Sequence, residues 1–352
     1  MKKLNSLCAS LLVTLAASAQ TATYTNPVIN RSAPDPTVVR ADDGTFYLYS
    51  TEDVRNLPIY SSKNLVNWTF VGTAFTDASR PQWLPEGGIW APCINRVGSQ
   101  YVLYYSKSVW GGEWDAGIGV ATSLSPTGPF TDHGNMFISK GIGIQNCIDP
   151  FYIEDGGRKY LFWGSFHGIY GCELSDDGMS LKAGAKPQQV AGSFMEGTYI
   201  KRRGGYYYLF GSAGTCCDGE RSTYRVTVGR SRSLFGPYVD RQGRPLLDNN
   251  FEVMLHRNQR VIGPGHNAEL VTDAEGSDWL LYHGFSADSP DEGRKVWLDR
   301  VDWVDGWPHI MGASPSAVAA APVVEGMKNL TLSGLDPAHF ESNIEGRQTH
   351  LY

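Results

Sequence analysis

The chain contains 352 residues, of which 41% are hydrophobic and 12% aromatic, so it can bury a large core. Its net charge of −6, without a basic block, argues against nucleic acid and anionic membranes as partners. The length would allow two domains, but a single all-β repeat array can also occupy it, and 40 glycines suit an architecture rich in tight turns.

The first 19 residues are predicted to be a signal peptide. Lysines at positions 2 and 3 precede an apolar stretch at 11–17, and the Ala-Ser-Ala sequence at 17–19 fits a cleavage site. No later stretch is long and apolar enough to span a bilayer. We therefore expect a soluble protein that is exported to the periplasm or the cell exterior, with no insertion into the membrane.

One sequence pattern recurs five times in the remaining chain. Each copy is a short apolar run, a polar or glycine-rich turn and an aromatic-rich run, which is typical of a β-hairpin. The copies are DPTVVRADDGTFYLYST from Asp35, APCINRVGSQYVLYYSK from Ala91, DPFYIEDGGRKYLFWGS from Asp149, EGTYIKRRGGYYYLFGS from Glu196 and NAELVTDAEGSDWLLYHG from Asn267.

A second sequence pattern lies between these copies. It consists of a strand, a turn and a short strand that contains an aromatic residue. It is clearest as IYSSKNLVNWTFVG from Ile59, GVATSLSPTGPFTDHG from Gly119 and VGRSRSLFGPYVDRQG from Val228. Two hairpins per unit and five units predict an all-β fold, a five-bladed β-propeller with four-stranded blades. We expect the propeller to span residues 20–312, and residues 313–352 to form a linker-like tail.

Three of the five copies begin with an acid, at Asp35, Asp149 and Glu196. Equivalent positions of a radial repeat converge on its axis, so these carboxylates are expected to face one another. A single Asp-Pro pair more often just starts a turn. Two such pairs at equivalent positions favour a site, and the proline is expected to hold each aspartate in an extended conformation.

These motifs resemble glycoside hydrolase family 43, and within it the arabinanases. The resemblance covers the chain from Asn26 to about Ser314, and NPVINRSAPDPTVV, GIWAP, NCIDP, MEGTYI and GPGHN occur in the family's order. The segments GSAGTCCDGERSTYRVTVGRS and WVDGWPHIMGASPS are particularly similar to arabinanases. The family's fold is a five-bladed propeller, in agreement with the repeat count.

The resemblance implies an inverting hydrolase that cleaves α-1,5-linked L-arabinan. Asp35 matches the general base that activates a water, and Glu196 matches the general acid that protonates the departing oxygen. Asp149 matches a third acid that raises the pKa of the general acid and orients it, which is physically coherent because a nearby negative charge raises a carboxyl's pKa. Inversion needs the two catalytic carboxyls about 6.5 to 9.5 Å apart, with room for a water.

Further positions match residues that contact the substrate in the family. The NCIDP motif departs from the usual Asn-Ala-Ile-Asp by a cysteine at position 147, and a tryptophan common after the third hairpin is replaced by His167. For the tryptophan of GIWAP, lining the pocket and filling the core are equal alternatives. The residues expected to bind substrate are Asn146, Ser165, Phe166, His167, Gly111 and Trp90.

The resemblance also places His266 of GPGHN near a metal at the propeller axis, usually calcium. Calcium prefers oxygen ligands, so waters would have to complete its shell. The alternative is a histidine that hydrogen-bonds Asp149 or the substrate. His283 in LLYHG is expected to be a structural residue of an inner strand.

Five cysteines remain after the predicted cleavage, and their spacing matches no zinc site. An odd number leaves at least one thiol without an intramolecular partner. For Cys216 and Cys217, two buried thiols are favoured over a disulfide between neighbours.

Three functions are compatible with these residues. Arabinan cleavage is the leading one, with a plant cell-wall polysaccharide or its oligosaccharides as the partner of a monomer. A β-xylosidase or an α-L-arabinofuranosidase would use the same three acids. A carbohydrate-binding propeller without catalysis would have no need of all three.

Overall fold

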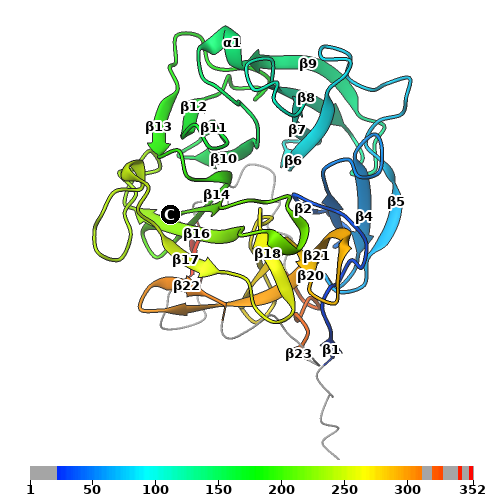
Figure 1. Cartoon of the computed structure of the whole chain (residues 1–352), viewed down its shortest axis with the longest axis vertical. Helices are drawn as coiled ribbons and strands as arrows, with labels where there is room; N and C mark the ends of the chain where they lie inside the picture. The colour runs from blue at the N-terminus through cyan, green and yellow to red at the C-terminus, as the bar shows by residue number, and fades with distance from the viewer. Residues whose placement is uncertain (1–21, 311–318, 328–339, 343–348, 352) are drawn as a thin grey trace, which may run out of the picture.

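In the computed structural model, residues 22–310 and 319–327 are described in full, and strands at 340–342 and 349–351 in their backbone only. Within these residues nearly all regular structure is β, and five sheets stand around a central axis (Figure 1). The predicted five-bladed propeller is thereby confirmed. The predicted signal peptide, residues 1–19, and most of the tail predicted at 313–352 lie outside the described residues.

The first two blades are antiparallel meanders of four strands each, with the first strand of each nearest the axis (Figure 1). Blade 1 consists of β2 (Thr37–Arg40), β3 (Phe46–Tyr49), β4 (Pro58–Ser62) and β5 (Thr69–Thr73). Blade 2 consists of β6 (Gly88–Val97), β7 (Gln100–Ser108), β8 (Gly117–Ser123) and β9 (Thr131–Ile138).

Blades 3 and 4 repeat this order, and blade 5 carries one additional short strand. Blade 3 consists of β10 (Phe151–Asp155), β11 (Arg158–Trp163), β12 (Ile169–Glu173) and β13 (Gln188–Ala191). Blade 4 consists of β14 (Glu196–Arg203), β15 (Tyr206–Ala213), β16 (Arg225–Ser231) and β17 (Glu252–Leu255). Blade 5 consists of β18 (Val261–Gly265), β19 (Val271–Thr272), β20 (Asp278–Ser286), β21 (Ser289–Val304) and β22 (Trp307–His309).

The core lies between neighbouring blades. One cluster of buried apolar side chains joins blades 5 and 1, a second joins blades 1 and 2, and a third extends over blades 2 to 5. The middle strands are therefore covered on both faces, and every residue of β20 is buried. This explains why the second half of each hairpin has a nearly continuous apolar run instead of strict alternation.

A strand near the N-terminal end of the described chain pairs with one that follows the propeller, beside blade 5. β1 (Thr23–Tyr24) pairs with β23 (Ala319–Ala320). The side chain of Asn26 hydrogen-bonds both the N–H and the carbonyl of Leu298 in β21. The N-terminal segment thus joins the last blade, and residues at the start of the predicted tail lie beside it. The remaining strands are β24 (Phe340–Ser342) and β25 (Thr349–Leu351), which pair with each other.

Helical structure is limited to three short turns in the described residues. They are α1 (Ser139–Ile142), η1 (Gly219–Arg221) and η2 (Leu246–Asp248). None of these helices is long or apolar enough to cross a membrane.

The cysteine prediction is wrong for one pair. Cys216 and Cys217 are joined by a disulfide, and neither is buried. They lie in the loop between β15 and β16, which extends beyond the sheet, so the packed core does not reach them. The other described cysteines, Cys93, Cys147 and Cys172, are free and buried.

Candidate active site

The three acids predicted from the repeat lie at the inner ends of the first strands of their blades. Asp35 precedes β2, Asp149 precedes β10 and Glu196 opens β14. Their exposed fractions are 8%, 5% and 8%, so all three carboxyls are buried to the same degree. Burial disfavours the charged form of each, and the partners of each acid therefore decide its protonation state.

The backbone at these positions differs from the prediction. Asp35 has φ 55° and Asp149 has φ 61°, so the following prolines do not hold them in an extended conformation. Ala91 and His266, at the equivalent positions of blades 2 and 5, also have positive φ, at 37° and 41°. Such values cost energy for residues other than glycine, and they persist where the surrounding structure imposes them. Here each backbone N–H is held by the neighbouring blade.

Glu196 is displaced by one residue from the position of the two aspartates. In blades 1 and 3, the second residue after the acid is paired with the end of the second strand, as Thr37 is with Tyr49. In blade 4 the equivalent residue is Tyr199, which pairs with Phe210. Gly197, with φ 63°, therefore occupies the aspartate position, and Glu196 stands one residue before it.

Asp35 is surrounded by positive charge. Its Oδ1 lies 3.1 Å from Nη1 of Arg294 and 3.2 Å from Nδ1 of His266, while Thr51 donates a hydrogen bond of 2.6 Å to Oδ2. Burial alone would raise the pKa of Asp35, but Arg294 and His266 outweigh it and hold the pKa well below its usual range. Asp35 is thus an ionised carboxylate, as a general base must be.

His283 supports Asp35 from behind. Its Nδ1 accepts the backbone N–H of Asp35 at 3.0 Å, and its ring stacks on Tyr224 with centroids 5.5 Å apart. Burial and the Arg294 charge lower the pKa of His283 to about 4, so the ring is neutral. The same Nδ1 lies 3.1 Å from Oδ1, but a nitrogen that accepts an N–H has no proton to donate to the carboxylate. His283 has a structural role, as predicted, but it lies near the end of β20, the second strand of blade 5, and not on an inner strand.

Glu196 is surrounded by hydroxyl groups. Ser165 donates to Oε2 at 2.6 Å, and Tyr224 donates to Oε1 at 2.8 Å. Burial raises the pKa of Glu196, and the two hydroxyls only partly offset it. No arginine or lysine contacts this carboxyl among the described residues, in contrast to Asp35.

Asp149 is coupled to Glu196. Burial and the negative charges of Glu196 and Asp35 raise the pKa of Asp149 to about 8, although His266 and the N–H of Gly197 act in the opposite direction. The N–H of Gly197 donates to Oδ2 of Asp149 at 3.2 Å. Two coupled acids with raised pKa values together retain a proton at neutral pH. This proton is available for donation to a leaving group.

His266 faces Asp35, with Nδ1 3.2 Å from Oδ1, and contacts no second acid among the described residues. Burial opposes its protonation, but the charges of Asp35, Asp149 and Glu196 outweigh burial and raise the pKa of His266 to about 9. No group of three or more His, Cys, Asp or Glu side chains in the described part of the chain is arranged to hold a metal. Protein oxygens alone would not complete a calcium shell here, because calcium takes about six to eight oxygen ligands, so water would have to supply most of them.

Five of the predicted substrate contacts lie on three loops that contact one another, the loops after β7, α1 and β11. Asn146 Nδ2 donates to the carbonyl of Ser165 at 3.2 Å. His167 Nε2 lies 3.0 Å from Oε2 of Glu113, which belongs to the loop after β7. Gly111, in that same loop, is exposed and has open space beside it. Ser165 contacts Glu196, so it belongs to the acid site.

Trp90 lines the rim and does not fill the core. It is half-buried, and its ring lies 5.5 Å from that of Trp110, which is 80% exposed. Trp90 pairs with Ser106 as Glu196 pairs with Ser212, so it occupies in blade 2 the position that the acid occupies in blade 4. This equivalence places its side chain at the same end of the propeller as Glu196.

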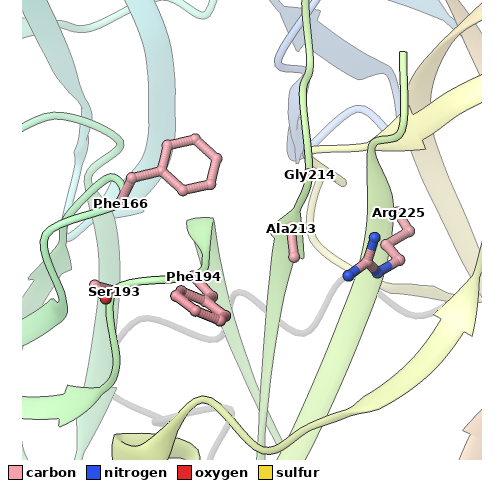
Figure 2. Close-up of a pocket in the computed structure, with 6 residues that line it drawn as sticks. All are labelled: Phe166, Ser193, Phe194, Ala213, Gly214 and Arg225. Carbon is pink, nitrogen blue, oxygen red and sulfur yellow. The ribbon is translucent and has the colours of Figure 1, made fainter. Parts of the chain in front are cut away.

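A pocket of about 230 Å³ opens between blades 3 and 4 (Figure 2). Phe166 and Phe194 stand on one side of it, and Arg225 points toward them from the other side. Phe166 has φ 53°, and its N–H is bound by the carbonyl of Met195, the residue before Glu196. The pocket is lined by Phe166, Ser193, Phe194, Ala213, Gly214 and Arg225.

Three residues of the site escaped the sequence analysis. Arg294 contacts Asp35, which lies 259 residues earlier in the chain. Tyr224 contacts Glu196, which lies 28 residues earlier. Thr51 contacts Asp35 from the end of the first hairpin. Tyr224 lies within the segment at 211–231 that resembles arabinanases, and this resemblance is the only sequence signal for it.

Comparisons with known proteins agree with this arrangement. The model of the family described as glycosyl hydrolases family 43 matches residues 24–308. An extracellular exo-α-(1→5)-L-arabinofuranosidase of Cellvibrio japonicus is 34% identical, over 78% of this chain and 85% of that protein. An extracellular endo-α-(1→5)-L-arabinanase of Bacillus subtilis is 32% identical, over 86% of this chain and 94% of that protein. A solved α-L-arabinanase from Cellvibrio cellulosa, in complex with arabinohexaose, is 31% identical with a TM-score of 0.72, over 79% of this chain and 95% of that one.

Proposed function

Because the chain belongs to glycosyl hydrolases family 43 and is a glycoside hydrolase, we propose that it cleaves α-1,5-linked L-arabinan with inversion. The observation that carries the proposal is the contrast between two equally buried carboxyls. Asp35 is paired with cations and ionised, whereas Glu196 is held by hydroxyls and coupled to a second acid. A reaction that needs one base and one acid requires such a pair.

In the proposed reaction, Asp35 takes a proton from a water molecule while the water oxygen attacks the anomeric carbon. The bond from that carbon to the leaving oxygen breaks, and Glu196 gives its proton to this oxygen. One proton enters the site from water and one leaves with the product alcohol, so charge is conserved. Arg294 and His266 hold Asp35 in its ionised form until the water binds.

Asp149 has the role of keeping a proton on the acid side. Its charge and that of Glu196 repel each other, so the pair binds a proton more tightly than either acid would alone. When Glu196 has delivered its proton, the N–H of Gly197 helps to hold the negative charge on Asp149.

The arabinan preference is supported by the relatives, whose names specify α-(1→5)-linked arabinose polymers. The pocket between blades 3 and 4 is lined by Phe166, the residue after Ser165, whose hydroxyl contacts Glu196. Phe166 and Phe194 offer apolar faces for a sugar ring, and the Arg225 guanidinium offers donors for its hydroxyls. Trp90 and Trp110 offer a second aromatic surface at blade 2.

Release of sugar from debranched arabinan tests this function. Purified wild type should release arabinose or arabino-oligosaccharides, and Glu196→Gln of equal melting temperature should not. Preferential cleavage of a xyloside over an α-L-arabinofuranoside would support the rival β-xylosidase, and cleavage of short arabinofuranosides alone would support the arabinofuranosidase. Sugar binding without any release by wild type would leave only a carbohydrate-binding propeller.

Two further expectations belong to this proposal. Export is supported by the extracellular relatives, and a monomer is expected, which light scattering would test. An axial calcium ion would have to be held by His266 and mostly by water, so no step of the reaction is routed through it. Chelation should lower the melting temperature of wild type more than that of His266→Ala. An elemental analysis that finds no calcium in the purified protein would contradict the calcium expectation.

A further inference from the structure

A hydrogen bond between neighbouring blades recurs around the axis. In four of the five junctions, a side chain near the end of one blade's second long strand accepts the N–H of the positive-φ residue in the next blade. We call these four contacts the inner ring. They are Thr51 Oγ1 with Ala91 at 2.7 Å, Ser106 Oγ with Asp149 at 2.9 Å, Ser212 Oγ with His266 at 2.7 Å and His283 Nδ1 with Asp35 at 3.0 Å.

The strand register identifies the position missing from the inner ring. In blade 1, Thr37 of the first strand pairs with Tyr49 of the second, and the acceptor Thr51 follows Tyr49 by two residues. The acceptors of the other three junctions follow the equivalent residue of their second strand by the same two positions. In blade 3 the paired residue is Phe162, so the expected acceptor is residue 164, which is a glycine. The junction between blades 3 and 4 therefore lacks the contact that the other four make.

Gly164 cannot be replaced by a hydroxyl residue on this backbone. Its φ is 135°, and a side chain there would collide with the carbonyl oxygen of Gly168. The hydroxyl is found one residue later, on Ser165, where it donates to Oε2 of Glu196 at 2.6 Å. Asn146 fixes the backbone of Ser165 through a hydrogen bond of 3.2 Å to its carbonyl.

The opposite strand shows the same displacement. Gly197 occupies the positive-φ position, and the acid stands one residue earlier. Without an acceptor at 164, the N–H of Gly197 donates to Oδ2 of Asp149. A side chain at 197 would lie about 3.0 Å from the nearest carbon of the His266 ring, so a larger residue here would need this ring to shift.

We propose that Ser165 is a positioning residue for the general acid, and that it reaches Glu196 because this one junction departs from the inner ring. The proposal rests on the proposed function. Ser165 and Tyr224 hold the two oxygens of the carboxyl, one each, so its plane cannot rotate. The proton of Glu196 then points at a constant place, where the leaving oxygen of a bound sugar must lie.

Ser165→Ala and Ser212→Ala form a matched pair for the test. Both serines are buried, at 2% and 0% exposed, and each variant loses a single hydroxyl from a blade junction. Ser165 contacts the acid, whereas Ser212 holds the backbone of His266 within the inner ring. Rates are measured on an arabino-oligosaccharide, whose leaving alcohol needs a proton, and on a 4-nitrophenyl α-L-arabinofuranoside, whose leaving group does not.

Ser165→Ala should lose on the order of tenfold in kcat/KM on the oligosaccharide and much less on the nitrophenyl substrate. Ser212→Ala should change both rates in the same proportion. Equal losses on both substrates by a folded Ser165→Ala, while wild type remains active, would overturn the positioning role alone. A wild type that cleaves neither substrate would overturn the proposed function and the positioning role with it.

Discussion

The site has a base side, at the junction of blades 5 and 1, and an acid side, at the junction of blades 3 and 4. The base side places a guanidinium and an imidazolium against Asp35, and the acid side places two hydroxyls and a second carboxyl around Glu196. Burial is equal on both sides, yet the pKa falls on one and rises on the other. The charge of the neighbours, and not the depth of burial, separates the base from the acid.

The largest effect should come from removing either carboxylate. Asp35→Asn and Glu196→Gln should each lower kcat by about 10²- to 10⁴-fold on arabinan, because a general base or acid typically contributes that much. On a nitrophenyl arabinofuranoside, Glu196→Gln should recover much of its rate and Asp35→Asn should not. Near-wild-type rates in either variant, or equal recovery of both, would remove the distinction between the two sides.

Asp149→Asn tests whether the coupled acid holds the proton on the acid side. Removal of its negative charge should lower the pKa of Glu196, so the alkaline limb of the kcat/KM profile should move to lower pH. The rate at the optimum should also fall severely, because Asp149 orients the site through Gly197. A profile with an unmoved alkaline limb would assign Asp149 to substrate binding.

Arg294→Gln weakens the base side. Without the guanidinium the pKa of Asp35 should rise, and the acidic limb of the profile should move to higher pH. Arg300→Gln is the matched control, since Arg300 lies in the same strand but makes an exposed ion pair with Asp302. The prediction is contradicted if both variants keep the wild-type acidic limb.

Tyr224→Phe makes the acid side less polar. The hydroxyl stabilises the charged form of Glu196, so its loss should raise the pKa of Glu196 and move the alkaline limb to higher pH. The rate at the optimum should fall by about tenfold or less, in keeping with one hydrogen bond to a charged group. Tyr238→Phe, which loses a buried hydroxyl bound to the carbonyl of Leu234, should affect stability only. A shift of the limb in both variants would point to a general packing effect.

The smallest expected effect is the change of the protein's stability with pH. The pKa of Asp149 is raised from 3.8 to about 8, so the folded state retains a proton that the unfolded chain releases, and stability declines as pH rises through this range. The pKa of His266 is raised from 6.5 to about 9, so its stabilising charge is present below 6.5 and is lost as pH rises through 9. Melting temperature should therefore fall from pH 6.5 to 9. A constant or rising melting temperature would mean that these charges do not interact as the geometry implies.

The sequence by itself determined the repeat, the five blades and the three acids. Hairpin patterning and glycine turns are local properties, and each copy carries them in about twenty residues. A family resemblance then assigned roles to the acids and directed attention to Ser165 and His266. The residues between the copies, such as Arg294, have no pattern that distinguishes them from surface positions.

Only the tertiary structure decided the partners of each acid. Asp35 meets Arg294 after 259 residues of chain, because closure of the ring brings blade 5 against blade 1. Asp-Pro suggested an extended backbone, but the inner ring holds Asp35 and Asp149 at positive φ. The displacement of Glu196 by one residue depends on the pairing of two strands and on a steric conflict at Gly164, and a linear sequence specifies neither directly.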